Sequence, residues 1–379
     1  MLRIAIVTNE SPPYRIPFFR MLGRMPDVVL QVLFCARREP NRLWEVPAFD
    51  FGHVFLKESI VTIHDRYVHN NPDVFAALRR FSPDVVVTGG FNPTHLYAFA
   101  YARLRGLPHV AMTDGTQVSE SGLSRLHARV RRFVYARSQA FVAASMGGLK
   151  LYAGYGLPAE SCFRAPLCID NGAFAPQAAL SERNVDMLFC GRFEKVKNPL
   201  FALDVAAATA RKLGRKISIA FIGAGKQEPE LRAAAMREDK LVNASFPGFL
   251  PHRSLPSFYQ AARLFLFPTL WDPWGVVANE ACAAGLPVLV SPNAGVAGEL
   301  VVDGWNGFVC ELNSDSWAER AAELLGREAV WQAFSRNSLR AVEDYSYGTA
   351  ASGLLAACRH AAANKAPDGA VVYERYIDR

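Results

Sequence analysis

The chain has 379 residues, of which 51% are hydrophobic, and its formal net charge is +7 at pH 7. This length suits two domains of ordinary size, and no uninterrupted apolar run approaches the roughly 20 residues that a membrane-spanning helix needs. The seven cysteines are scattered and include no Cys-x-x-Cys pair, which argues against a disulfide framework and against a zinc site. The N-terminus has no basic leader or cleavage site, so we expect a globular protein that stays in the cytoplasm.

The positive charge lies entirely in the first half of the chain. Residues 1–175 contain 20 Lys plus Arg against 13 Asp plus Glu, whereas residues 176–379 contain 22 of each kind. Basic surfaces attract nucleic acid, anionic lipid or phosphorylated substrates. The chain shows no zinc-finger spacing and no aromatic motif of the RNA-binding kind. We therefore do not expect nucleic acid as a partner.

Strand and helix patterns alternate in the first half. Compact apolar runs predict strands, and apolar residues at helical spacing predict helices. This alternation predicts a parallel sheet whose ligands gather at the carboxyl ends of the strands. We expect strands over residues 3–8, 28–35, 53–56, 84–88, 109–113 and 141–144, and helices over residues 16–25, 73–81, 93–105 and 124–138.

Polar residues follow two of these strands. Gly90, Asn92 and His95 come after one buried strand, and Asp114 follows the next strand along the chain. If the strands are parallel neighbours, these residues line one side of a ligand site. His95 could equally be an ordinary histidine on a helix surface. An acid at the position of Asp114 could instead cap the following helix.

The predicted helix at 124–138 is both basic and amphipathic. A helix that packs on the domain core with a solvated basic face is one interpretation, and a helix that docks on a membrane is the other. Since each Lys or Arg near an anionic surface is worth about 1 kcal/mol, the second interpretation predicts reversible, salt-sensitive binding at the inner face of the cell membrane. The apolar residues are Leu126, Val130, Phe133 and Val134, and the cations are Arg125, Arg129, Arg131, Arg132 and Arg137.

A turn-rich segment at 168–172 marks the change from the first domain to the second. We place the boundary near residue 175, which gives a first domain of 1–175, with 349–379 packing back on it, and a second domain of 176–348. The second domain repeats the alternation of the first. We expect strands over residues 185–190, 217–222, 244–249 and 264–267, and helices over residues 199–212, 255–262, 276–284, 314–326, 328–343 and 349–363.

Two cations lie in the loop after the first strand of the second domain. Arg192 and Lys197 precede a helix N-terminus there, and a forked guanidinium with an ammonium makes a natural clamp for a diphosphate. The next strand ends in Gly223 and Gly225, which could belong to a dinucleotide-binding fingerprint. Glu228 occupies the position of the third glycine of that fingerprint, so we do not expect a nicotinamide cofactor.

The stretch 264–290 has the pattern of a strand, a loop, a helix and a strand. A helix opened by Gly275 presents unpaired backbone amides and the positive end of its dipole, which suits a phosphate. Glu280 lies in the second turn of that helix, where its carboxylate can accept hydrogen bonds from two vicinal ribose hydroxyls. Asp272 would reach the group on the far side of the same phosphate. The alternative is a buried helix with one exposed glutamate.

Asp272 and Glu280, with Gly275 and the turn at 283–288, resemble the Glu-x7-Glu signature of retaining glycosyltransferases of family four, the glycosyl transferases group 1. The first acid is Asp here and not the usual Glu. The family's basic pair, its Gly-x-Gly loop and its Gly-Phe stretch have counterparts in the same order. The resemblance implies the glycosyltransferase-B fold, an α/β fold of two Rossmann-like domains whose parallel sheets face a cleft, with a C-terminal helix that crosses back to the first domain.

The resemblance also implies roles for individual residues. In many family members a histidine near the reacting sugar holds the place of Asp114, which could orient an acceptor hydroxyl or share its proton. A Gly-Gly pair is common in the first loop, where this chain has Arg15. The implied catalytic residues are Arg192, Lys197, Asp272 and Asp114, the implied donor-binding residues are Glu280, Gly223, Gly225, Gly248, Phe249, Trp274, Gly275 and Val276, and those on the acceptor side are Arg15, Gly90, Asn92 and His95.

The implied function is that of a retaining hexosyltransferase in polysaccharide biosynthesis. It would move a sugar from a nucleotide-sugar, a UDP-sugar in preference to a GDP-sugar, to a lipid-linked or cell-surface glycan precursor. Arg192, Lys197 and the helix amides would stabilise charge on the departing diphosphate, and the chain has no Asp-x-Asp motif, so we expect neither a metal ion nor another cofactor. The alternatives are a nucleotide-sugar epimerase or hydrolase, a transferase with a soluble small-molecule acceptor, and a module that only binds a nucleotide.

Overall fold

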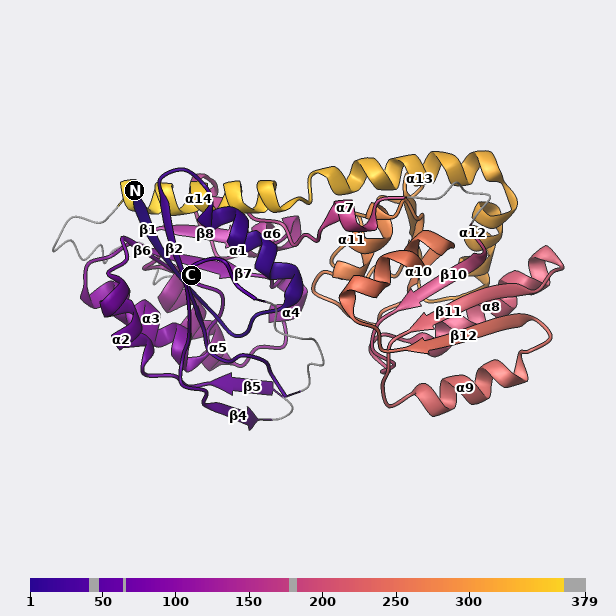
Figure 1. Cartoon of the computed structure of the whole chain (residues 1–379), viewed down its shortest axis with the longest axis horizontal. Helices are drawn as coiled ribbons and strands as arrows, with labels where there is room; N and C mark the ends of the chain where they lie inside the picture. Colours follow the sequence, from indigo (N-terminus) through magenta and orange to yellow (C-terminus); the bar gives the residue numbers. More distant parts are fainter. Residues whose placement is uncertain (41–47, 64–65, 177–182, 365–379) are drawn as a thin grey trace. The chain divides into compact units, whose positions relative to one another are not determined.

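A computed structural model describes residues 1–40, 48–63, 66–176 and 183–364. The chain divides into two compact units, which are coloured along the sequence in Figure 1. The first contains Met1–Ala165 and the described residues from Ala350 onward, and the second contains Pro166–Thr349. The division falls before the expected boundary near residue 175, because Asn171 already bonds within the second unit. Its Nδ2 donates a hydrogen bond to the carbonyl of Val342 at 3.1 Å.

The first unit is built on a parallel sheet. Its strands lie in the order β3-β2-β1-β6-β7-β8-β9, and each pairing between neighbours is parallel. The inner strands are continuous apolar runs, as expected when helices cover both faces of a sheet. The strands are β1 (Leu2–Thr8), β2 (Val28–Phe34), β3 (His53–Phe55), β6 (Val85–Thr88), β7 (His109–Thr113), β8 (Ala140–Ala143) and β9 (Cys162–Arg164).

Helices connect most of these strands, and a separate antiparallel hairpin pairs β4 (Ile60–Ile63) with β5 (Arg66–His69). The sequence analysis did not predict this hairpin, which lies between the predicted strand at 53–56 and the predicted helix at 73–81. The helices of the first unit within Met1–Ala165 are α1 (Ile16–Gly23), α2 (Val74–Phe81), α3 (Pro93–Leu104), α4 (Gln117–Glu120), α5 (Arg125–Tyr135) and α6 (Met146–Gly154), with short 3-10 turns η1 (Pro13–Arg15) and η2 (Ala159–Ser161).

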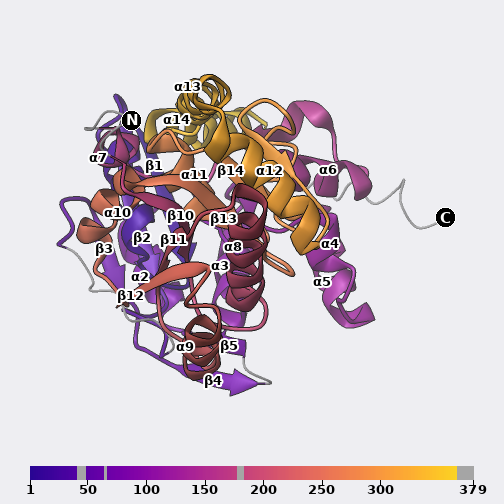
Figure 2. The same cartoon turned by 90° about the vertical axis from the view of Figure 1, so that its right-hand side faces the viewer.

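The second unit has a parallel sheet with the order β12-β11-β10-β13-β14-β15. Figure 2 shows α8 and α12 side by side, and they bury Ala206 and Trp317 in one core with the sheet. The strands are β10 (Val185–Cys190), β11 (Ile217–Ile222), β12 (Val242–Gly248), β13 (Ala262–Phe267), β14 (Val288–Val290) and β15 (Gly307–Val309), and the helices are α7 (Asn171–Phe174), α8 (Pro199–Leu213), α9 (Glu228–Arg237), η4 (His252–Ser254), α10 (Leu255–Ala261), α11 (Val276–Ala283), α12 (Ser314–Gly326) and α13 (Glu328–Glu343).

Both sheets reverse their strand order at one place. In the first unit the chain builds outward from β1 to β3 and then returns to add β6 on the other side of β1. In the second unit β13 is added beside β10 in the same way. Loops diverge at such a switch point and leave a crevice above the carboxyl ends of the strands, where ligands bind in α/β folds. The strand order confirms the predicted α/β fold with two Rossmann-like units.

The last described helix, α14 (Tyr347–Ala363), packs on the first unit, as predicted for a C-terminal helix that returns there. The ring of His360 lies 5.4 Å from that of Phe163, and its Nε2 lies 3.3 Å from the hydroxyl of Ser161. At Gly353 the helix backbone approaches the carbonyl of Arg164 so closely that an added methyl group would lie 1.9 Å from the oxygen. The rest of the segment 349–379 that we expected to pack on the first domain, residues 365–379, lies outside the described residues.

The basic helix α5 contacts the core through a different face from the one expected. Val134 and Tyr135 are its buried residues, and the Tyr135 ring packs edge-on against Phe141 and other aromatic rings. Leu126 is 68% exposed and Phe133 is 52% exposed, which corrects the interpretation that these side chains pack in the core. None of the helices in the described ranges is both long and apolar enough to cross a membrane.

The contact at Gly353 predicts a stability effect. Gly353→Ala should lower the thermal unfolding midpoint by several degrees, because overpacking costs about 1–3 kcal/mol and each kcal/mol shifts the midpoint of a domain of this size by about 2–4 °C. Gly348→Ala is the matched control in the same helix, since its nearest neighbour would be a serine hydroxyl at 3.7 Å. Scanning calorimetry of both variants is the test, and equal midpoints would contradict the packing described.

Candidate functional site

The switch point of the second unit brings two predicted residues together. Lys197 lies in the loop after β10 and Asp272 in the loop after β13, and the Lys197 ammonium donates to Oδ2 of Asp272. The two side chains are 19% and 15% exposed. The other oxygen, Oδ1, accepts the backbone N–H of Trp274 at 3.0 Å. Asp272 is therefore oriented through both of its oxygens.

Backbone contacts fasten the same two loops. The carbonyl of Val196 accepts the N–H of Leu270 at 2.8 Å and the hydroxyl of Thr269 at 2.9 Å. Thr269 lies two residues beyond the end of β13, and Val196 directly precedes Lys197, so the two loops are joined beside the ion pair. The ion pair between Lys197 and Asp272 is thus carried on a fixed frame, which is what a preorganised charge site requires.

Arg192 lies in the same loop but nearer to solvent. Its side chain is 51% exposed, and its Nη1 pairs with Glu194 at 2.8 Å. An exposed ion pair of this kind is weak and easily exchanged. The loop therefore offers one cation that is held by Asp272 and a second that can reach a ligand from outside.

The glycines predicted at the next loop pack directly against the Arg192 loop. A methyl group added at Gly223 would lie 1.9 Å from the carbonyl oxygen of Gly191, and one at Gly225 would lie 2.4 Å from that of Phe193. The N–H of Gly223 donates to the carbonyl of Gly248 at 3.0 Å. The structure therefore gathers these loops at one edge of the sheet, where Phe249 follows with an exposed fraction of 50%.

The N-terminus of α11 begins at Val276, after Gly275. Gly275 has a φ of 108°, and an added methyl group would lie 2.2 Å from the ring of Phe267. Both constraints require glycine at this position. No side chain caps this helix end, and the carbonyl of Gly275 accepts the N–H of Ala278 at 2.9 Å. The two preceding amides and the positive end of the helix dipole therefore suit an anionic ligand.

Trp274 corrects one expectation. Its indole is 2% exposed, stacks on Tyr345 with ring centroids 5.4 Å apart, and donates from Nε1 to Asn279 at 2.8 Å. The side chain therefore packs beneath the surface of the loop, against Tyr345 and Asn279, and does not present a surface to a ligand. The backbone of Trp274 is hydrogen-bonded as well, since its N–H donates to Asp272 and its carbonyl accepts the N–H of Val296 at 3.1 Å.

Glu280 is buried and has a protein partner at each of its two carboxylate oxygens, in contrast to the exposed glutamate of the alternative interpretation. It is 4% exposed. Its Oε2 accepts the hydroxyl of Tyr259 at 2.6 Å, and its Oε1 lies 3.4 Å from Nε2 of His252. The hydrogen bond to Glu280 raises the pKa of His252 above its ordinary value, against the opposite effect of burial. Tyr259 and His252 were not predicted as site residues, since both lie outside the recognised motifs.

A cavity of about 160 Å³ lies at the switch point of the first unit. Arg15 and Asp114 meet there, because Nη2 of Arg15 lies 2.7 and 2.6 Å from the two carboxylate oxygens. Asp114 does not cap α4, since Thr116 accepts the N–H of Ser119 in that role. The lining residues are Thr8, Asn9, Glu10, Pro12, Tyr14, Arg15, Glu39, Gly89, Met112 and Asp114.

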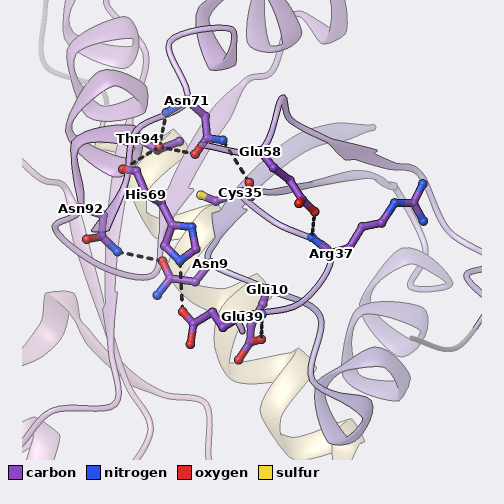
Figure 3. A network of polar contacts seen from close by, with 10 residues as sticks. All are labelled: Asn9, Glu10, Cys35, Arg37, Glu39, Glu58, His69, Asn71, Asn92 and Thr94. Carbon is purple, nitrogen blue, oxygen red and sulfur yellow. Dashed lines mark hydrogen bonds and ion pairs between the residues drawn. The ribbon is translucent and has the colours of Figure 1, made fainter. Parts of the chain in front are cut away.

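A buried polar network adjoins this cavity, and Figure 3 shows its members. Nε2 of His69 lies 3.0 Å from Glu39, and the N–H of Glu39 donates to Glu10 at 3.0 Å. Asn92, which the sequence predicted, donates to Asn9 at 3.2 Å. Glu10, Glu39 and His69 were missed because they come from three separated segments that only the fold brings together.

His95 and Gly90 have a structural relation to each other. His95 is 1% exposed, which corrects both earlier interpretations, because it lies neither on a helix surface nor among the cavity lining. A methyl group at Gly90 would lie 3.3 Å from the His95 ring. Burial lowers the pKa of His95 to about 3, so the imidazole is neutral and supports the loop that carries Gly90.

The described residues contain no group of three or more His, Cys, Asp or Glu side chains placed to hold a metal ion.

Residues 172–340, which include the switch point of the second unit, match the family described as glycosyl transferases group 1. Over these residues the chain is similar to the group 1 glycosyltransferases. This match covers the ion pair, the glycine loops and Glu280, and it agrees with the resemblance found in the sequence.

Two curated relatives illustrate the range of similarity. The chain is 29% identical over 244 residues to the glycogen synthase of Mycobacterium tuberculosis (strain ATCC 25618 / H37Rv), which covers 61% of this chain and 57% of that protein. It is 33% identical over 181 residues to the D-inositol 3-phosphate glycosyltransferase of Mycobacterium avium (strain 104), which covers 46% of this chain and 41% of that protein. The chain thus spans little more than half the length of the first relative.

A solved structure extends the comparison to the whole fold. The Anabaena protein Alr3699/HepE, in complex with UDP, superimposes with a TM-score of 0.73 over 94% of this chain and 98% of that chain, at 16% identity. At this identity the similarity establishes the fold alone. The shared architecture is the glycosyltransferase-B fold that the sequence predicted.

The partial burial of the Lys197–Asp272 pair predicts energetic coupling. A double-mutant cycle with Lys197→Met and Asp272→Asn should give a coupling in the free energy of unfolding of about 1–3 kcal/mol. The exposed pair Arg192–Glu194 is the matched control, with an expected coupling of about 0.2–1 kcal/mol. Urea unfolding of the seven proteins in the two cycles, which share the wild type, measures both couplings. Equal couplings would show that the first pair is no more ordered than a surface contact.

Proposed function

We propose that this protein is a glycosyltransferase that moves a sugar from a nucleotide-sugar donor to a hydroxyl of an acceptor. The observation that carries the proposal is the Lys197–Asp272 pair at the β10–β13 switch point, beside the N-terminus of α11. The cation and the helix amides suit the diphosphate of a nucleotide-sugar, and the anion suits a hydroxyl of its sugar.

Each part of the donor has a candidate partner. The diphosphate is bound by Lys197, Arg192 and the α11 amides, and Asp272 accepts a hydroxyl of the donor sugar. Glu280 accepts hydroxyls of the ribose, and the backbone around Gly248 contacts the base. The UDP bound to the Anabaena neighbour favours a UDP-sugar as the donor.

The reaction proposed is a substitution with retention. The bond between the anomeric carbon and the diphosphate oxygen breaks, a bond from the acceptor oxygen to that carbon forms on the same face, and the acceptor proton passes to the departing diphosphate. Charge grows on the diphosphate in this step, so the fixed cations and helix amides lower the barrier. Because these groups carry the charge, the proposed transfer needs no metal ion. Asp114 is proposed to orient the acceptor hydroxyl from the first unit.

The acceptor is proposed to be lipid-linked. Exposed apolar side chains on α4 and α5 lie among outward cations, since Val118, Leu126 and Phe133 are 67%, 68% and 52% exposed. Arg125, Arg129 and Arg132 are exposed on the same helix, whereas Arg131 turns inward to pair with Glu120 at 2.8 Å. We call Val118, Leu126, Phe133 and these three arginines the α5 face. It fits an anionic membrane surface, because both the apolar and the charge terms favour lipid.

The proposed function is tested with a panel of nucleotide-sugars, in which released nucleotide and glycosylated product are measured with and without lipid acceptors. Acceptor-dependent product with EDTA present is the expected result. Nucleotide release without any acceptor would indicate a hydrolase, a changed sugar without release would indicate an epimerase, and binding without turnover would indicate a silent module. If product forms with a soluble acceptor such as an inositol phosphate, the proposal of a lipid-linked acceptor is replaced by that of a soluble one. Loss of activity in EDTA that magnesium or manganese restores would contradict the charge argument.

The basic clamp predicts the effect of single variants in that assay. Lys197→Ala and Arg192→Ala should each lower turnover about 10²–10³-fold, because loss of one charge-stabilising donor costs about 2.7–4 kcal/mol. Lys195→Ala is the matched control, since Lys195 is an exposed cation of the same loop. Circular dichroism shows whether each variant is folded. A folded Lys197→Ala or Arg192→Ala enzyme with the native rate would remove that residue from the clamp.

The α5 face predicts salt-sensitive binding to anionic vesicles. Changing Arg125, Arg129 and Arg132 to Glu should abolish cosedimentation at low salt, because it reverses the charge that meets the lipid. The control changes Arg79, Arg80 and Arg105 to Glu, which alters the net charge equally at exposed positions on α2 and just after α3. A wild-type protein that stays in the supernatant at low salt would leave a soluble acceptor as the better proposal.

A further inference from the structure

The carboxylate of Glu280 is held at both ends by residues that the proposed function does not use. Tyr259 donates to Oε2 at 2.6 Å, and Nε2 of His252 lies 3.4 Å from Oε1. Two partners on two different oxygens fix the rotation of the carboxylate as well as its position. A carboxylate accepts hydrogen bonds at about four lone-pair sites, so these contacts leave room for two ribose hydroxyls.

Tyr259 is a rigid donor. It is fully buried and lies between aromatic rings, stacked on Phe265 with centroids 5.6 Å apart and edge-on to Phe174 at 5.4 Å. Burial raises the pKa of Tyr259 well above its ordinary value, with the nearby Cys190 and Glu280 acting in the same direction. The phenol therefore keeps its proton at any working pH, and its hydrogen bond to Glu280 does not switch.

His252 is the changeable partner. It begins η4, just beyond β12 and Phe249, and its side chain is 41% exposed. The groups that face it are Glu280 from α11 and Asp170 from the N-terminus of α7, while the Phe174 ring lies 5.7 Å away and Arg253 is its own neighbour. The hydrogen bond to Glu280 and the two negative charges raise its pKa above the ordinary value, and burial acts in the opposite direction. Both acids therefore favour the imidazolium.

We propose that His252 and Tyr259 are positioning residues for the nucleoside of the donor, and that the proton on His252 strengthens donor binding through Glu280. This inference rests on the proposed function, in which Glu280 accepts the ribose hydroxyls. A buried carboxylate is destabilised when it has no counter-charge. The imidazolium provides that charge, so Glu280 can be desolvated further when a ribose covers it.

The sign of the pH dependence follows from these charges. Below the raised pKa of His252 the imidazolium balances Glu280 and attracts the anionic diphosphate. As the pH rises through that pKa the positive charge is lost, and an anionic donor meets a buried, uncompensated carboxylate. Donor binding should therefore weaken with rising pH, and bound donor should raise the pKa of His252 further by linkage.

The test uses titration calorimetry with the nucleotide-sugar of the panel that binds most tightly. Both phosphates of such a donor are esterified, so the ligand does not titrate near neutral pH. The dissociation constant of the wild type should rise about threefold or more from about pH 6 to about pH 8.5. For His252→Gln the dissociation constant should not change with pH and should stay close to the high value of the wild type at about pH 8.5. For Tyr259→Phe the dissociation constant should be higher than that of the wild type at every pH and should rise with pH to the same extent.

His127→Gln, at an exposed position on α5, is the matched control and should keep the wild-type profile. NMR titration of the His252 ring is the second measurement, in which Glu280→Gln should lower its pKa without any donor present. A profile that is flat in the wild type, or that persists in His252→Gln, would overturn the inference and leave the proposed function intact. If no nucleotide-sugar binds the wild type, both fall together.

Discussion

The ion pair between Lys197 and Asp272 joins the two loops that leave β10 and β13, the strands between which the sheet of the second unit reverses its order. Parallel strands have no local connection, so their neighbouring ends diverge into separate loops. A charge on each loop ties the two together without closing the space above them. The positions of the α11 amides and Glu280 follow from this arrangement, because the β13 loop leads directly into that helix.

The glycines at this edge are required by neighbouring backbone as much as by any ligand. Gly223 and Gly225 lie under the loop that carries Arg192, and a side chain at either position would displace its carbonyl groups. Gly275 lies against the ring of Phe267. A motif that reads as a phosphate-binding signal is therefore also a packing signal, in which the same small residues let three loops approach one another.

The sequence predicted the elements well where a strong period was present. The bounds of α12 and α13 and of β10 and β11 agree with the predicted ranges, since their apolar spacing is regular and turn residues flank them. The candidate residues at strand ends, Lys197 and Asp272 among them, were also identified in advance. Their direct contact was not predicted, because it depends on β13 being added beside β10 and not at the sheet edge.

Contacts between elements account for what the sequence did not reveal. Tyr259 and His252 meet Glu280 only because α10 and η4 pack beside α11, and no spacing within one element indicates that. His95 and Trp274 have the polarity of ligand contacts but are buried by neighbours distant in the chain. Leu126 and Phe133 have the helical spacing of core residues, yet α5 rotates to bury Tyr135 in an aromatic cluster instead.

The return of α14 to the first unit makes that unit discontinuous in the chain. Its backbone contact with Arg164 closes only after residue 353 has emerged from the ribosome, whereas the second unit is complete once Thr349 is available. During synthesis the surface around β9 therefore stays uncovered until the whole of the second unit has been made. A fragment that ends at residue 165 would carry that uncovered surface permanently, and a fragment spanning 166–349 would not.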